Sequence, residues 1–158
     1  MILFPSVNDR IFSSKSQKEV CSILQEITEP RYTSFIKECD FIGQVDEFGF
    51  MICPYRFPSR NSFLPVIEGE IISKENGSEI LIKMRLHRIV SIFMAVWFAG
   101  VFFAFLFGLL LMLADGIKTA YPFLLVSGGM IAAGQILVRL SFLLPARKAL
   151  KKIRGLLE

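Results

Sequence analysis

Two long hydrophobic stretches dominate the pattern of apolar and polar positions along the chain. Residues 89–114 contain no Asp, Glu, Lys, Arg or His, and neither do residues 119–138. About 20 apolar residues in a helix cover the hydrocarbon core of a bilayer. Each stretch therefore predicts a transmembrane helix, and the second can extend to residue 144. The polar residues 115–118 predict a short external turn between two antiparallel helices.

The first 88 residues have the shorter periods of a small α+β domain. Ser16 and Glu19 fit the capping box that starts a helix, and apolar residues recur at helical spacing until Pro30. Alternating residues predict one strand before this helix and four after it. The expected strands cover residues 7–12, 41–45, 48–52, 63–74 and 80–87, with Phe48, Phe50 and Ile52 on one face and a type I′ turn at Asn76-Gly77.

The segment 145–158 predicts a basic amphipathic helix that begins at Pro145. Its apolar stripe runs from Ala146 to Leu157, and basic residues cover the rest of its surface. Such a helix can lie in the lipid headgroup region, where basic residues favour anionic lipid. Its stripe can equally pack on the sheet and complete the domain core. The two interpretations are compatible.

The distribution of charge predicts an orientation in the membrane. Residues 1–88 hold 11 Lys and Arg against 12 Asp and Glu, whereas residues 139–158 hold 6 against 1. Positive residues favour the cytoplasmic side. We therefore expect a multi-pass protein of the inner membrane with both termini in the cytoplasm. The residues expected at the membrane interface are Arg85, His87, Arg88, Arg139, Arg147, Lys148, Lys151, Lys152 and Arg154.

No set of residues with a catalytic pattern stands out in the sequence. His87 is the single histidine, the carboxylates are spread over helix and turns, and no glycine-rich phosphate loop or metal-ligand spacing occurs. The three cysteines Cys21, Cys39 and Cys53 are expected to be free thiols in the domain core. We expect no enzyme, no cofactor, no metal and no nucleic-acid partner. The expected partners are the lipid bilayer and a protein or small ligand.

The segment 55–65 combines arginines, aromatic residues and prolines between two predicted strands. Arginine pairs with anions and aromatic rings offer stacking faces, so the segment is a candidate ligand-binding loop. A rigid connection with its aromatic residues in the core is the alternative. The candidate ligand-binding residues are Tyr55, Arg56, Arg60 and Asn61.

Small residues form a seam on each predicted membrane helix. Such seams let helix backbones approach closely. They predict either packing of the hairpin on itself or a homo-oligomer of several hairpins. The residues are Gly100, Ala104 and Gly108 on the first helix, and Gly128, Gly129, Ala132, Ala133 and Gly134 on the second.

The run from Arg60 to Gly69, followed by Met84 to His87 before a membrane helix, resembles a group of small bacterial two-helix membrane proteins without an assigned activity. The resemblance covers about residues 41–98 and implies a membrane location. Our leading hypothesis is a non-enzymatic, membrane-anchored binding module. A membrane effector, as in antiphage defence, in which ligand binding drives hairpin oligomerisation and membrane disruption, is the second hypothesis. An accessory subunit of a membrane complex is the third.

Overall fold

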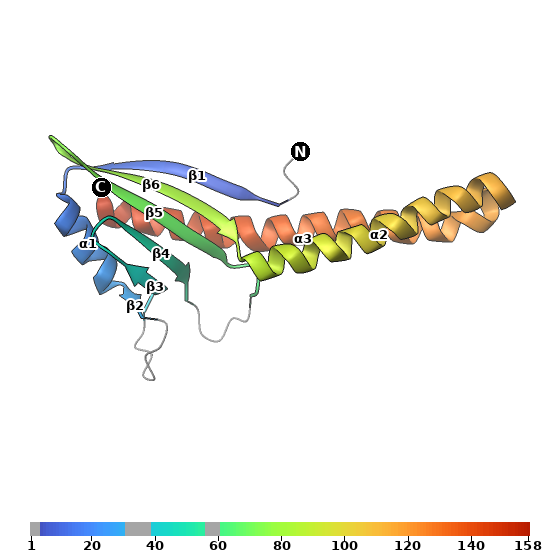
Figure 1. Ribbon diagram of the computed structural model, residues 1–158, viewed down its shortest axis with the longest axis horizontal. Coiled ribbons are helices and arrows are strands. Elements are labelled where there is room, and N and C mark those ends of the chain that lie inside the picture. Colours follow the sequence, from blue (N-terminus) through green and yellow to red (C-terminus); the bar gives the residue numbers. More distant parts are fainter. Residues whose placement is uncertain (1–3, 31–38, 56–60) are drawn as a thin grey trace. The chain divides into compact units, whose positions relative to one another are not determined.

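The computed structural model describes residues 4–30, 39–55 and 61–158. It confirms the α+β class, with a six-stranded sheet followed by two long apolar helices. The chain forms two compact units, one of residues 1–87 together with 141–158 and one of residues 88–140. Figure 1 shows the elements of each unit.

The sheet has the order β1-β6-β5-β4-β3-β2. All neighbouring strands are antiparallel except β2, which pairs in parallel with β3. The two-residue strand β2 is an addition to the five strands that the sequence predicts. The strands are β1 (Ser6–Ser13), β2 (Thr28–Glu29), β3 (Phe41–Val45), β4 (Gly49–Pro54), β5 (Pro65–Lys74) and β6 (Gly77–Leu86).

Helix α1 (Gln17–Glu26) begins at the predicted capping box. The backbone N–H of Ser16 donates to Glu19 Oε2 at 2.7 Å, and the N–H of Glu19 donates to Ser16 Oγ at 3.4 Å. Two backbone donors that a helix start leaves free are therefore satisfied. The buried side of α1 presents Val20, Cys21 and Leu24 to the core.

Two local predictions for the strands are wrong. Phe48 precedes β4 and is 71% exposed, whereas Phe50 and Ile52 are buried. The β5–β6 turn residues are Glu75 and Asn76, because Lys74 pairs with Gly77. A type I′ turn needs positive φ at both central residues, and no non-glycine residue described here has one. Gly77 instead has a φ of 130°, and a Cβ there would lie 2.1 Å from the Ser13 carbonyl oxygen.

The apolar helices are α2 (Arg88–Asp115) and α3 (Ile117–Leu157). Only Gly116, with a φ of 84°, separates them, so the turn is shorter than the predicted residues 115–118. Helix α3 is also continuous through Pro145, where the sequence predicts a new helix. Close contacts hold α2 and α3 together between residues 88 and 140: the Phe107 and Phe123 rings are 5.8 Å apart, and Gly134 lies under the Trp97 ring.

The C-terminal part of α3 packs on the sheet and completes the core of the first unit (Figure 1). The buried positions recur every three or four residues, as one helix face requires. The stripe therefore belongs to the domain core, as the second interpretation of this segment predicts. The buried residues on this part of α3 are Phe142, Ala146, Ala149, Ile153 and Leu157.

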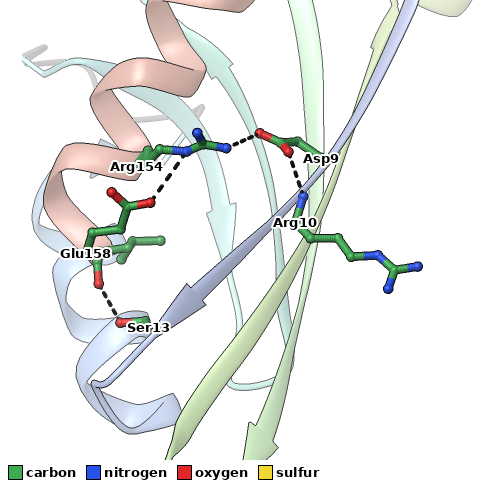
Figure 2. A network of polar contacts seen from close by, with 6 residues as sticks. Asp9, Arg10, Ser13, Arg154 and Glu158 are labelled. Carbon is green, nitrogen blue, oxygen red and sulfur yellow. Dashed lines mark hydrogen bonds and ion pairs between the residues drawn. The ribbon is translucent and has the colours of Figure 1, made fainter.

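Polar contacts fix the end of α3 against β1 (Figure 2). Arg154 donates to Asp9 Oδ2 at 2.7 Å and forms an ion pair with Glu158. The Leu157 carbonyl oxygen accepts hydrogen bonds from Ser13 Oγ and, at 3.0 Å, from Lys15 Nζ. A cation at a helix C-terminus also opposes the negative end of the helix dipole. The last turn of α3 is therefore anchored as well as buried.

Candidate functional site

No metal-binding cluster is formed by the residues that the structure describes. Among them, no three His, Cys, Asp or Glu side chains gather closely enough to hold a metal ion. Burial raises the pKa of the Cys21 thiol, and the nearby carboxylates of Glu47 and Asp46 raise it further. Burial, followed by the charge of Glu29, likewise raises the pKa of Cys39. Both thiols therefore stay protonated, which disfavours nucleophilic chemistry.

A cavity of about 270 Å³ lies between one end of the β3–β4 hairpin and α3, entirely within the first unit. It has an apolar wall, a polar rim and three charged side chains. Its small volume is suited to a small molecule or a headgroup. The lining residues are Asp40, Phe41, Pro54, Tyr55, Asn61, Leu64, Leu144, Pro145, Lys148, Ala149 and Lys152.

The strand ends hold two of the polar lining residues together. The backbone N–H of Tyr55 donates to the Asp40 carbonyl oxygen at 2.8 Å, one step beyond the Phe41–Pro54 pair of the ladder. The Asp40 carboxylate forms an ion pair with the Lys152 ammonium across the cavity. Both side chains of this pair are nearly half exposed. The pair is therefore solvated and can open at little cost.

Asn61 connects the opposite side of the cavity to α3. Its Nδ2 donates to the Ser141 carbonyl oxygen at 3.2 Å, and its Oδ1 accepts from the backbone N–H of Phe63 at 3.0 Å. In a regular helix the Ser141 carbonyl would accept from the N–H of residue 145, but Pro145 has none. Asn61 supplies the missing donor. The continuity of α3 through Pro145 is thus linked to the shape of the cavity.

The cavity carries an excess of positive charge. Lys148 and Lys152 lie one helical turn apart, so their side chains share a face of α3. Asp40 opposes Lys152, whereas Lys148 is exposed and has no ion-pair partner among residues 4–30, 39–55 and 61–158. Two ammonium groups against one carboxylate favour an anionic ligand.

No family model, curated protein or solved structure matches this chain. The resemblance in residues 41–98 therefore stays a prediction.

The structure places two of the four predicted ligand-binding residues in the cavity lining, namely Tyr55 and Asn61. Arg56 and Arg60 lie outside the described residues. The sequence does not identify Asp40 as a ligand-binding residue, because its place in the cavity depends on the pairing of the strands. It assigned Lys148 and Lys152 to the membrane interface and not to a cavity. A proline within an apolar helix leaves one carbonyl oxygen without a donor, and an asparagine side chain can supply that donor. This is the signal in the sequence that could have linked Asn61 to the region of Pro145.

Three of the basic residues predicted at the membrane interface form ion pairs with carboxylates of the first unit. Arg85 pairs with Glu68, while Lys152 and Arg154 pair with Asp40 and Asp9. Their charges are therefore partly neutralised within the domain. Arg147, Lys148 and Lys151 are exposed on α3, as are Arg88 and Arg139 on the two helices, while His87 is half-buried before α2.

The small-residue seams serve different purposes within residues 88–140. An added Cβ would meet Trp97 at 2.6 Å from Gly134, and Leu124 and Phe123 at 3.1 Å from Gly108, so these two glycines allow close packing of α2 on α3. Gly100 and Ala104 instead line an open apolar groove of about 470 Å³. Gly129, Ala132 and Ala133 are exposed, and Gly128 is half-buried near Phe105.

Both α2 and α3 are long and apolar enough to cross a membrane, by length and composition. Only 17% and 11% of the residues in their most apolar windows are buried within the protein. A core helix of a soluble protein would have most of these side chains covered. The two helices are thus compatible with membrane association.

Proposed function

We propose that the protein is a non-enzymatic, membrane-anchored binding module of the inner membrane. Helices α2 and α3 span the bilayer, and the sheet unit faces the cytoplasm with the cavity as its ligand site. One observation carries this proposal: α3 is a single continuous helix that contains the second apolar stretch and also lines the cavity with residues 144–152. Ligand binding would therefore act directly on a membrane helix.

The chemistry of the cavity supports binding without catalysis. Lysines, a tyrosine, an asparagine and a paired carboxylate surround it, with apolar residues on the remaining wall. These groups can bind and orient a ligand. Neither a nucleophile paired with a base nor a set of metal ligands is found near them among the described residues.

The orientation follows from where the basic residues lie along the two helices. Arg88 stands at the start of α2, and Arg139 is followed in α3 by five more basic residues up to Arg154. Near the turn between the helices, the only charged residues are Asp115 at the end of α2 and Lys118 at the start of α3. The positive-inside rule then assigns the start of α2 and the C-terminal part of α3 to the cytoplasmic side.

Cysteine accessibility tests this topology in a cysteine-free background. Lys118→Cys, at the start of α3 beside the turn, should react with a membrane-impermeant maleimide applied to intact spheroplasts. Ser73→Cys, exposed at the end of β5, should react only after permeabilisation. The chain should also stay in the membrane after alkaline extraction. Its release by alkali, or labelling of Ser73→Cys from outside, would refute the proposal.

A second candidate function is a membrane effector that disturbs the bilayer on self-association. The open groove at Gly100 and Ala104 favours it, because helices of a second copy can approach closely there. A Cβ added at Gly100 meets no atom within 4 Å, so there is room for a larger residue to begin there. Gly100→Ile should therefore fill the groove and leave the hairpin intact.

Cross-linking and a potential-sensitive dye test the effector hypothesis in cells. An effector should form cross-linked oligomers and depolarise the membrane on expression, and Gly100→Ile should prevent both. Leu110→Ile, at an exposed position of α2 outside the groove, is the control and should change neither. A monomer in mild detergent with an intact membrane potential under all conditions tested would exclude this function.

A further inference from the structure

We propose that the cavity between the β3–β4 hairpin and α3 binds a phosphate group of net negative charge, with Lys148 and Lys152 as its cationic ligands and Asp40 as the internal competitor for Lys152. This inference rests on the proposed function, because it names the ligand class of the same site.

The two lysines give the site its preference for an anion. They are four residues apart on α3, so their ammonium groups can approach one phosphate from the same helix face. Each ammonium offers three donors and no acceptor, and hydrogen bonds between charged partners are stronger than neutral ones. A phosphate group has several acceptor oxygens and can therefore engage both lysines at once.

Two neutral side chains on the rim can add donors. The Tyr55 hydroxyl can donate, and its backbone is held beside Asp40 by a 2.8 Å hydrogen bond. Asn61 uses one Nδ2 hydrogen for the Ser141 carbonyl, and its second hydrogen remains for a ligand. The apolar wall, which includes Leu64 and Leu144, suits a glycerol or alkyl part attached to the phosphate.

The position of Lys148 along α3 places it within reach of the lipid headgroup region, where phosphate groups are abundant. The charge-free stretch of α3 ends at Val138, and the second predicted span can extend to Leu144. Lys148 follows Leu144 by four residues, or about 6 Å along the helix axis. The headgroup region on each side of a bilayer is about 5–8 Å thick. The phosphate of an anionic phospholipid and a soluble phosphate ester can therefore both supply the ligand.

Asp40 makes the site selective for anions that bind Lys152 more tightly than its own carboxylate does. In the structure the Asp40 carboxylate forms an ion pair with the Lys152 ammonium, and both side chains are nearly half exposed. Exposed pairs of this kind are weak, so a phosphate that also engages Lys148 can displace Asp40. Removal of the Asp40 charge should therefore tighten phosphate binding, whereas loss of a merely structural ion pair would not.

Two binding experiments on the purified full-length chain in a neutral mild detergent distinguish the sources. In one, native mass spectrometry compares retention of phosphatidylglycerol with that of zwitterionic phosphatidylcholine. In the other, inorganic phosphate is titrated calorimetrically in a phosphate-free buffer. Preferred phosphatidylglycerol without phosphate binding assigns a lipid headgroup, and saturable phosphate binding assigns a soluble phosphate.

Matched variants separate the cavity from general surface charge. Lys148→Gln should weaken binding about tenfold or more, as expected for the loss of a charged hydrogen bond. Lys151→Gln removes the same charge from a position outside the cavity and should leave affinity nearly unchanged. Asp40→Asn should increase affinity roughly threefold or more, since a net repulsive charge is removed.

Several outcomes would overturn the inference. Binding of neither probe, equal losses in Lys148→Gln and Lys151→Gln, or weaker binding in Asp40→Asn would each do so. These results are distinguishable from failure of the proposed function, because the cysteine accessibility and alkaline extraction experiments report on the membrane anchor without any ligand.

Discussion

The side-chain amide of Asn61 donates a hydrogen bond to the carbonyl oxygen of Ser141, the backbone acceptor that Pro145 leaves without its helical partner. Asn61 and Ser141 are 80 residues apart in the sequence. The bond connects the segment before β5 to α3 and satisfies an otherwise free carbonyl. Stability of the domain and the shape of the cavity therefore depend on the same contact.

A double-mutant cycle tests this contact. Asn61→Ala should lower the free energy of unfolding by about 1–2 kcal/mol, because the Ser141 carbonyl loses its donor. In the Pro145→Ala background, the N–H of residue 145 can supply that donor, so the same change should cost much less. Thermal denaturation of the full-length chain in mild detergent measures all four variants. Equal costs in both backgrounds would show that the two residues are independent.

The burial of Ile153 tests whether the end of α3 belongs to the domain core. Ile153 is fully buried, so Ile153→Ala should lower the free energy of unfolding by about 2–4 kcal/mol. Lys151→Ala, on the exposed side of the same turn, should change it by less than about 0.5 kcal/mol. Chemical denaturation followed by circular dichroism gives both values. A similar small effect of both variants would contradict the observed packing.

The capping box should make stability depend on acid pH. The backbone N–H of Ser16, and then its hydroxyl, stabilise the charged carboxylate and lower the pKa of Glu19 from its ordinary 4.5. A lowered folded-state pKa contributes stability that is present above the unfolded-state value and is lost as pH falls through the folded-state value. Melting temperatures measured from neutral pH down to below 4.5 should therefore decline.

The variant Glu19→Gln isolates this contribution. Its amide oxygen can still accept from the Ser16 backbone N–H, because glutamine also fits the capping box. The difference in melting temperature between the wild type and Glu19→Gln should be largest at neutral pH and should shrink in acid. A difference that is constant with pH would show that the Glu19 charge plays no part.

Alkylation kinetics should reveal the protonated state of Cys21. Burial, and then Glu47 and Asp46, raise its pKa above the ordinary 9.0, and its Sγ–H donates to the Asp46 carbonyl oxygen at 3.5 Å. With Cys39→Ser and Cys53→Ser in place, iodoacetamide should react slowly at pH 8 and increasingly fast beyond pH 9, because the thiolate is the nucleophile. A rate that levels off below pH 9 would contradict the raised pKa.

The sequence predicts best where the structure depends on local interactions. The capping box at Ser16 and Glu19 determines the start of α1, and strict alternation over residues 80–87 predicts β6, which the structure ends at Leu86. The sequence does not predict strand β2, because two residues are too few to show an alternating pattern and the residues that they pair with on β3, such as Phe41 opposite Thr28, are distant in the sequence. The β5–β6 turn differs because Gly77 provides the positive φ after the turn and not within it.

The candidate site was only partly predictable for the same reason. Aromatic and polar composition pointed to Tyr55 and Asn61, which the structure places in the cavity lining. Asp40 and Lys152 come together only through strand pairing and the packing of α3. The sequence predicts a new helix at Pro145, whereas α3 is continuous there, because Asn61 of a distant segment supplies the donor that the missing N–H of Pro145 would have provided.

The C-terminal part of α3 also constrains the order in which the protein can fold. The sheet is synthesised first, but Phe142, Ile153 and Leu157 of its core are added only after both apolar stretches, residues 89–114 and 119–138, have been made. Domains commonly fold as they emerge from the ribosome. Here the sheet cannot acquire its full core until translation has passed the hairpin, so completion of the domain reports that the whole apolar region has been made.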